Sequence, residues 1–141
     1  MNHKLTEYFE NCLYFTAGNL YRQVERLAFS AFARLNIAPS KAFLLMAVYE
    51  QKDGASAPSS LAELMQLDKS TVTRLISGLE KDGYVKRNKK GRHSVISLTA
   101  KGRALLPDIN ECWEELYDSY VKLWGEKKAN KLNSVIFNFL F

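Results

Sequence analysis

Apolar residues recur along the first third of the chain at steps of three, four and seven positions, which is the spacing of one face of an amphipathic helix. This pattern predicts one long helix from residue 5 to about residue 35. A second apolar set widens the stripe beyond what a single partner surface needs. The two sets are Leu5, Phe9, Leu13, Leu20, Val24, Leu27 and Ala31, and Tyr8, Phe15 and Phe29.

The middle of the chain is divided into shorter elements by proline and serine. Pro39 is typical of a helix stop, and Ser40 is a suitable N-cap for a second helix over residues 41–50. Residues 51–60 are polar and contain glycine and proline, so they predict a loop. A short helix with four apolar residues follows within 61–65.

The next segment predicts a helix and then a change of period. Asp68 suits the N-cap of a helix over residues 68–82, and two short helices joined by a tight turn predict a helix-turn-helix unit. From residue 84 to residue 98, two short and partly alternating runs flank Lys90-Gly91-Arg92. This arrangement predicts a β-hairpin with a basic tip.

The fold class that follows is mainly α with a small β-hairpin, in one domain of 141 residues. Two further amphipathic helices are expected at about 100–123 and 126–140, with apolar positions at Leu105, Ile109, Trp113, Leu116, Tyr120 and Leu123, and at Leu132, Val135, Ile136, Phe139 and Leu140. We expect a winged helix-turn-helix core over residues 40–99. The segments 1–38 and 100–141 then form a helical dimerisation region.

Composition narrows the function mainly by exclusion. The net charge of +5 is mild, no segment has the pattern of a signal peptide or membrane span, and no Walker, GxSxG, HExxH or GxGxxG motif is present. The two cysteines and two histidines have no zinc-ligand spacing. We therefore expect a cytoplasmic protein that is not an enzyme and uses no cofactor or metal.

The helix over residues 68–82 has one apolar and one polar side. At about 100° per residue, Val72, Leu75, Ile76 and Leu79 fall together and predict the buried side. The opposite arc has small hydroxyl side chains, a glycine and two cations, which suit close approach to bases and phosphates in a DNA major groove. An ordinary solvated helix face is the alternative. The residues of this arc are Thr71, Thr73, Arg74, Ser77, Gly78 and Lys81.

The predicted hairpin, over residues 84–98, shifts the balance toward DNA. It has no carboxylate, whereas a hairpin that only protects a sheet edge would more often carry both signs of charge. A narrow basic ribbon can approach a minor groove. The hairpin holds Lys86, Arg87, Lys89, Lys90, Arg92 and His93.

These segments together resemble the multiple-antibiotic-resistance regulator (MarR) family of winged helix-turn-helix regulators. The matching motifs are Leu-Glu-x-x-Gly at 79–83 and Leu-Thr-x-x-Gly at 98–102. The resemblance implies a homodimer on a pseudo-palindromic duplex operator, with the terminal helices interlocked. It further implies DNA contacts from Ser70, Thr71, Thr73 and Arg74 and a wing-tip arginine, Arg92.

The resemblance also implies that a small aromatic or anionic effector releases the DNA. The residues expected to line the effector pocket are Tyr14, Phe15, Tyr21, Phe43 and Tyr49. Aromatic residues at such spacings are more often plain core.

Two positions depart from the family pattern. Lys90 stands where the family wing commonly has an aspartate that holds the wing arginine. Aligned with a peroxide-sensing branch of the family, Tyr14 rather than Cys12 occupies the sensing position. Cys12 is therefore expected to be a small hydrophobe.

The leading hypothesis is a sequence-specific DNA-binding transcription regulator, and a repressor because no activation surface is recognisable. One alternative is a winged-helix module whose basic face binds an acidic protein. The other alternative is a redox-switch regulator that acts through Cys12.

The apolar stripes predict that the protein is a dimer in the absence of DNA. The residues of the first and last helices exceed what one small domain buries, and obligate dimers commonly bury about 2,000 Å² or more in total. We expect sedimentation at micromolar concentration to give twice the chain mass of 16.1 kDa. A single species at the chain mass would contradict the prediction.

Overall fold

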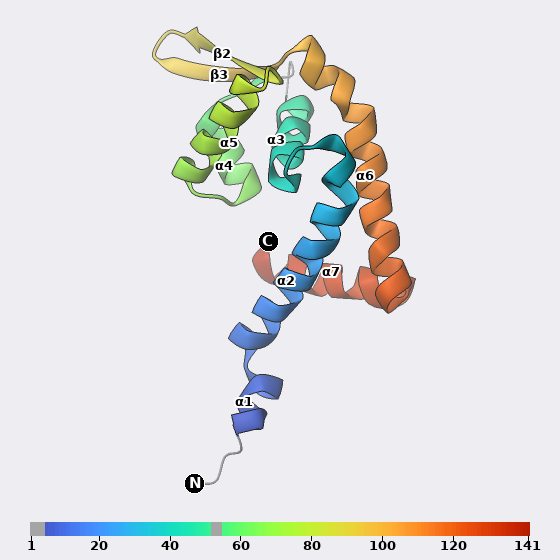
Figure 1. The fold of residues 1–141 in the computed structure, drawn as a ribbon. Helices are drawn as coiled ribbons and strands as arrows, with labels where there is room; N and C mark the ends of the chain where they lie inside the picture. The colour runs from blue at the N-terminus through green and yellow to red at the C-terminus, as the bar shows by residue number, and fades with distance from the viewer. Residues whose placement is uncertain (1–4, 52–54) are drawn as a thin grey trace. The chain divides into compact units, whose positions relative to one another are not determined.

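The chain is mainly helical with a small antiparallel sheet in the computed structural model, which describes residues 5–51 and 55–141 (Figure 1). The predicted fold class is confirmed. The elements are α1 (Leu5–Asn11), α2 (Leu13–Phe32), the 3₁₀ helix η1 (Ala33–Leu35), α3 (Pro39–Glu50), β1 (Ala55–Ser56), α4 (Pro58–Met65), α5 (Lys69–Lys81), β2 (Val85–Lys90), β3 (His93–Leu98), α6 (Ala100–Trp124) and α7 (Glu126–Leu140).

The chain forms two compact units. One, here called the winged-helix unit, is Phe32–Glu114, and it contains the predicted core over 40–99. The other, the terminal-helix unit, comprises the described residues up to Ala31 together with Glu115–Phe141. Helix α6 contributes residues to both units. No single helix of the described residues is long and apolar enough to cross a membrane.

The prediction of one unbroken N-terminal helix is wrong, because Cys12 separates α1 from α2. The side-chain amide of Asn11 donates to the carbonyl of Glu7 at 2.9 Å. Asparagine side chains compete in this way with the helical hydrogen bond to the same carbonyl. Helix α2 then starts afresh, and the backbone and hydroxyl of Thr16 both donate to the Cys12 carbonyl, at 2.9 and 3.1 Å.

Two helix starts also differ from the prediction. Pro39 is the first residue of α3, so it begins a helix instead of stopping one, and Ser40 lies inside that helix. Proline is favoured at this position because its fixed φ suits a helix and its missing N–H has no partner there anyway. Asp68 does occupy the N-cap position of α5, but its carboxylate forms no capping hydrogen bond within the described residues.

The core of the winged-helix unit is formed where α3, α4 and α5 contact one another and the sheet. Helix α5 contributes the predicted Val72, Ile76 and Leu79, all with 0% exposure, while Leu75 is half-buried. Removing such side chains from water is what holds short helices in place. The other fully buried members include Leu44, Leu45, Val48, Leu61 and Ile96.

The sheet has the strand order β1-β3-β2, with both pairs antiparallel. Strands β2 and β3 form the predicted hairpin, in register from Val85 opposite Leu98 to Lys90 opposite His93. Its turn contains Gly91 at φ +64°, a conformation that glycine adopts without strain. Strand β1 was expected to be loop. Two residues are too few to show a strand period in the sequence, and their pairing with β3 is a tertiary contact.

Hydrogen bonds of one threonine connect the start of α6 to the end of α5. The Thr99 hydroxyl donates to the Gly83 carbonyl at 2.6 Å and accepts from the Gly102 N–H at 3.1 Å. The Thr99 N–H donates to the carbonyl of Tyr84 at 3.1 Å. Lys101 adds a hydrogen bond to the Asp82 carbonyl at 2.7 Å. This cluster, here called the Thr99 junction, holds together α5, the hairpin and α6.

The terminal-helix unit exposes most of its apolar side chains. Within it, Tyr120 stacks on Trp124, and the Tyr117 hydroxyl donates to Asn130 at 3.1 Å. Elsewhere large apolar groups face solvent, with exposures of 80% for Leu13 and 86% for Phe139. These are the residues on which the prediction of a dimer rests.

Gly102→Ala should destabilise the protein, because a methyl group there would lie closer to the backbone carbonyl of Tyr84 than Cβ atoms occur in proteins. Forced overpacking of this kind costs roughly 1–3 kcal/mol. Urea unfolding at fixed protein concentration would measure it. Gly78→Ala is the matched control, since the methyl group there meets the movable ammonium of Lys41. Equal effects of the two substitutions would show that the junction is not tightly packed.

Candidate nucleic-acid interface

Helix α5 presents the polar face that the sequence predicts. Ser70, Thr73, Arg74, Ser77 and Lys81 are exposed, and Thr71 is half-buried at the edge of the face. None of the described residues forms a salt bridge with Arg74, so its guanidinium is free to meet a ligand. The structure thus brings all six predicted residues of α5 together on or beside one exposed helix face.

Gly78 was expected on this face, as a small residue that allows close approach to DNA. Instead it lies against α3, where a Cβ atom at position 78 would be 2.8 Å from the Lys41 ammonium. That ammonium also lies 3.8 Å from the Asp82 carboxylate. Gly78 therefore makes room for a side chain of α3 and not for DNA, and the helical arc alone could not distinguish the two neighbours.

Thr73 has a narrower role than the sequence suggests. Its hydroxyl donates to the Lys69 carbonyl one turn earlier, at 2.8 Å. With its proton engaged, the hydroxyl oxygen acts as an acceptor. In this state Thr73 cannot donate to a phosphate, but it suits the amino group of adenine or cytosine.

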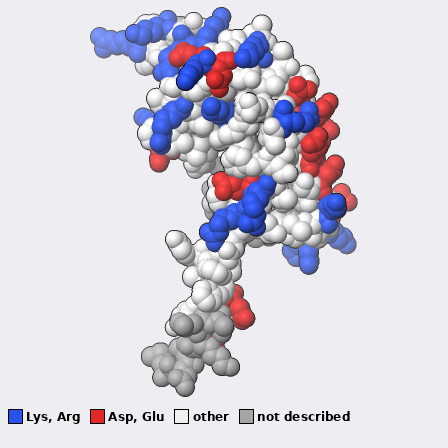
Figure 2. All heavy atoms as spheres, viewed as in Figure 1, with Lys and Arg blue, Asp and Glu red and all other residues white. Residues whose placement is uncertain are grey.

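The hairpin carries the predicted basic side chains on a projecting ribbon, and Figure 2 shows Lys and Arg along its length. Lys86, Arg87, Lys89 and Arg92 are all exposed. The side chain of Lys90 lies outside the described part of the structure. Because lysine and arginine contact phosphate without regard to sequence, such a ribbon suits the DNA backbone.

An ion pair links the hairpin to α5. The Arg87 guanidinium lies 3.8 Å from the Glu80 carboxylate, and both side chains are partly exposed. An exposed pair of this kind contributes little to stability, about 0–1 kcal/mol. It does compensate the negative charge of Glu80 on α5, so the surface offered by α5 and the hairpin stays positive.

Sequence reasoning missed one lysine of this surface. Lys69 is the first residue of α5 and borders a cavity of about 290 Å³. The same cavity is lined by Thr73 and, from the hairpin, by Arg92 and His93. A cation at the start of a helix has no distinctive pattern, and only the fold places Lys69 beside the hairpin.

Comparison with known proteins agrees with this geometry. The model of the MarR family matches residues 37–92. The HTH-type transcriptional repressor YetL of Bacillus subtilis is 29% identical over 129 residues, which cover 81% of this chain and 77% of YetL. The winged-helix unit thus resembles the MarR family of regulators.

Solved structures of other proteins share the whole fold. A cysteine-to-serine mutant of MarR from E. coli, complexed with operator DNA, superimposes with a TM-score of 0.82 at 18% identity, covering 95% of this chain and 98% of MarR. CouR from Rhodococcus jostii RHA1, bound to p-coumaroyl-CoA, gives a TM-score of 0.78 at 20% identity and 94% coverage of both chains.

The two MarR-family motifs have structural explanations in this chain. In the first, Leu79 is fully buried, and Gly83 adopts φ +81° as α5 ends. In the second, Leu98 is buried, and Thr99 and Gly102 form the Thr99 junction. Both motifs therefore specify the joint between the recognition helix, the hairpin and α6.

The residues predicted to line an effector pocket are divided between the units. Tyr14, Phe15 and Tyr21 belong to the terminal-helix unit, and Phe43 and Tyr49 to the winged-helix unit. Tyr14 is 91% exposed. The charge of the Glu25 carboxylate, with smaller contributions from burial and their hydrogen bond, raises the pKa of Tyr21.

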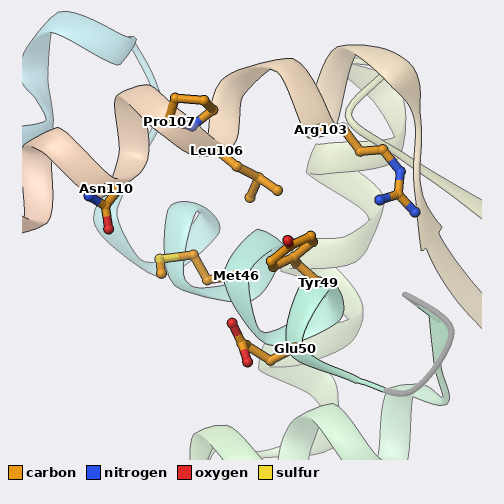
Figure 3. A pocket seen from close by; sticks show the side chains of 7 residues that line it. All are labelled: Met46, Tyr49, Glu50, Arg103, Leu106, Pro107 and Asn110. Carbon is orange, nitrogen blue, oxygen red and sulfur yellow. The ribbon is translucent and has the colours of Figure 1, made fainter.

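Phe43 is half-buried, and its ring packs edge-on against Trp113 at 4.2 Å between centroids. Tyr49 does line a cavity of about 440 Å³ between α3 and α6 (Figure 3). Figure 3 shows Leu106 of α6 pointing toward Tyr49, with Arg103 and Glu50 at the sides. A pocket formed by all five predicted residues remains a prediction.

Neither cysteine is bonded to the other, and Cys12 is a half-buried free thiol at the break between α1 and α2. Cys112 is buried. No group of three or more potential metal ligands occurs among the described residues. The redox alternative thus gains no support from a neighbouring cation or partner thiol in the described residues.

Proposed function

We propose that this chain is a sequence-specific DNA-binding transcription repressor that acts as a homodimer. One observation carries the proposal: an exposed, hydroxyl-rich and cationic face of α5 lies in the same unit as a basic hairpin. The structure of E. coli MarR with operator DNA supports a DNA target, and the name of YetL supports repression.

In this proposal residues 68–82 enter the major groove. Arg74 is long enough, and free enough of salt bridges with described residues, to bond a guanine edge with two N–H groups. Thr73 accepts from a base amino group, as its own hydrogen bond to Lys69 dictates. Ser70, Thr71, Ser77 and Lys81 then contact the backbone or neighbouring bases and fix the orientation of the helix.

The hairpin over residues 84–98 contacts the DNA backbone at the edge of the adjacent minor groove. Lys89, Lys90 and Arg92 supply the charge at its tip. Lys90 replaces the aspartate that commonly steadies the wing arginine, so we assign the tip to phosphate binding rather than to base reading.

Dimerisation follows from the exposed apolar surface of the terminal-helix unit. A second copy would remove side chains such as Leu13 and Phe139 from water. Two-fold symmetry of the protein would then be matched by a pseudo-palindromic operator. A dimer seated on such an operator represses by occupying it, without any catalytic activity or cofactor.

A small aromatic or anionic effector would release the DNA by favouring another conformation of the dimer. The binding of p-coumaroyl-CoA by CouR supports a ligand of this class. Tyr14, Phe15, Tyr21, Phe43 and Tyr49 remain the residues that the sequence predicts for its site. Since the target is chromosomal DNA, we place the protein in the cytoplasm.

The experiment that tests the function is selection of bound duplexes from a random DNA pool. We expect a palindromic consensus with two half-sites. Retention of all duplexes alike, with a salt dependence but no consensus, would instead favour a basic surface that binds acidic partners nonspecifically.

Arg74→Ala should weaken binding to the selected operator by roughly 1–3 kcal/mol and relax the preference at one base pair in each half-site. Lys81→Ala is the comparison on the same helix, and it should weaken binding to all sequences alike. Titration of operator and scrambled duplexes at one salt concentration measures both. If the Arg74 variant loses affinity equally on both duplexes, Arg74 is a phosphate contact and does not read a base.

A further inference from the structure

A basic cavity lies where the first turn of the recognition helix meets the hairpin. Its volume is about 290 Å³, and its walls come from the starts of α4, α5 and β3. The polar side chains that line it are those of Ser59, Lys69, Thr73, Arg92, His93 and Ser94. Three segments distant in sequence thus converge on one small hollow.

The charge of the cavity is of one sign. Lys69 and Arg92 are cations, His93 is a hydrogen-bond donor in either protonation state, and no carboxylate lines the walls. Neither Lys69 nor Arg92 forms an ion pair within the described residues. Two acids, Glu63 and Asp68, line a separate hollow that Lys69 also borders.

The serine hydroxyl groups add hydrogen-bond donors to the cavity. The side-chain hydroxyls of Ser59 and Ser94 make no hydrogen bond among the described residues, so their protons are available to a ligand. Thr73 differs because its proton is held by the Lys69 carbonyl. An anion with several oxygen acceptors matches these donors, and a cationic or purely apolar ligand does not.

We propose that this cavity seats one backbone phosphate of the bound DNA in each half-site. The inference rests on the proposed function and names a contact within it. A phosphodiester presents one negative charge and two unbridged oxygens, which Lys69, Arg92 and the serine hydroxyls can bond together. A free anion has the same chemistry, but DNA is favoured because the cavity opens beside the exposed face of α5.

Such a phosphate would fix the register of the protein on the duplex. Lys69 lies only five positions before Arg74, and Arg92 is in the hairpin, so one phosphate would align the base-reading helix and the wing at once. Arg92 would then be held by the phosphate and by the cavity walls, without the aspartate that position 90 lacks.

The test uses the selected operator with single phosphates replaced, one at a time, by uncharged methylphosphonate. We expect the intact protein to lose about tenfold in affinity at one position in each half-site, as for other charged hydrogen bonds. Lys69→Gln should lose a similar factor on the unmodified operator. On the duplex neutralised at that position, Lys69→Gln should lose little more, because the contact is already gone.

Lys86→Gln is the matched control, because it removes one exposed charge of the same hairpin outside the cavity. The affinity lost through Lys86→Gln should add in full to the affinity lost through methylphosphonate at the sensitive position. His93→Ala provides a second cavity variant, and it should be coupled to the same phosphate as Lys69→Gln.

The outcomes separate the two proposals. A protein that selects no duplex overturns the DNA function and the phosphate seat together. The protein could instead bind its operator, with the affinity lost through Lys69→Gln adding in full to the affinity lost through methylphosphonate at every position. That result would overturn the proposed phosphate seat alone. If inorganic phosphate binds the intact protein but not Lys69→Gln, while neutralising any single DNA phosphate leaves the affinity for the operator unchanged, the cavity binds a free anion and the seat is likewise overturned.

Discussion

The Thr99 hydroxyl is the interaction on which the arrangement of the winged-helix unit depends. It donates to the carbonyl of Gly83 as α5 ends and accepts from the N–H of Gly102 as α6 begins. Each of these backbone groups lies at a helix end, where no partner within the helix satisfies it. A single side chain therefore completes two helix ends and joins them, with Gly102 close enough to Tyr84 that no other residue fits without a shift.

The consequence of this junction is that the recognition helix and the hairpin form one body. The Arg87–Glu80 pair lies along the same joint, although exposed ion pairs add little stability. The hydrogen bonds and the buried side chains of α5 hold the position of the hairpin, and the charges determine what the assembled surface can bind. A phosphate seated between Lys69 and Arg92 would contact both parts of this body at once.

The two units differ in how much of their apolar surface a single chain buries. The winged-helix unit buries a complete core in a single chain, from Leu44 and Leu45 to Ile96. The terminal-helix unit leaves large apolar groups such as Tyr14 and Phe139 in water, and exposed apolar surface of this kind is typical of protein interaction sites. In the proposed function, the first unit binds a polyanion and the second binds another copy of the chain.

The local pattern of hydrophobic and polar residues alone determined much of this protein's secondary structure. Helix α5 was predictable because Val72, Ile76 and Leu79 repeat at helical spacing, and the hairpin because its residues change to an alternating period around Gly91. Tertiary structure decided what depends on neighbours distant in sequence. It paired the two residues of β1 with β3, turned Gly78 toward Lys41, and brought Lys69 beside Arg92. The break at Cys12 and the bond that occupies the Thr73 proton are local in sequence, yet they too escaped prediction, because a hydrophobic period does not report where a polar side chain bonds its own backbone.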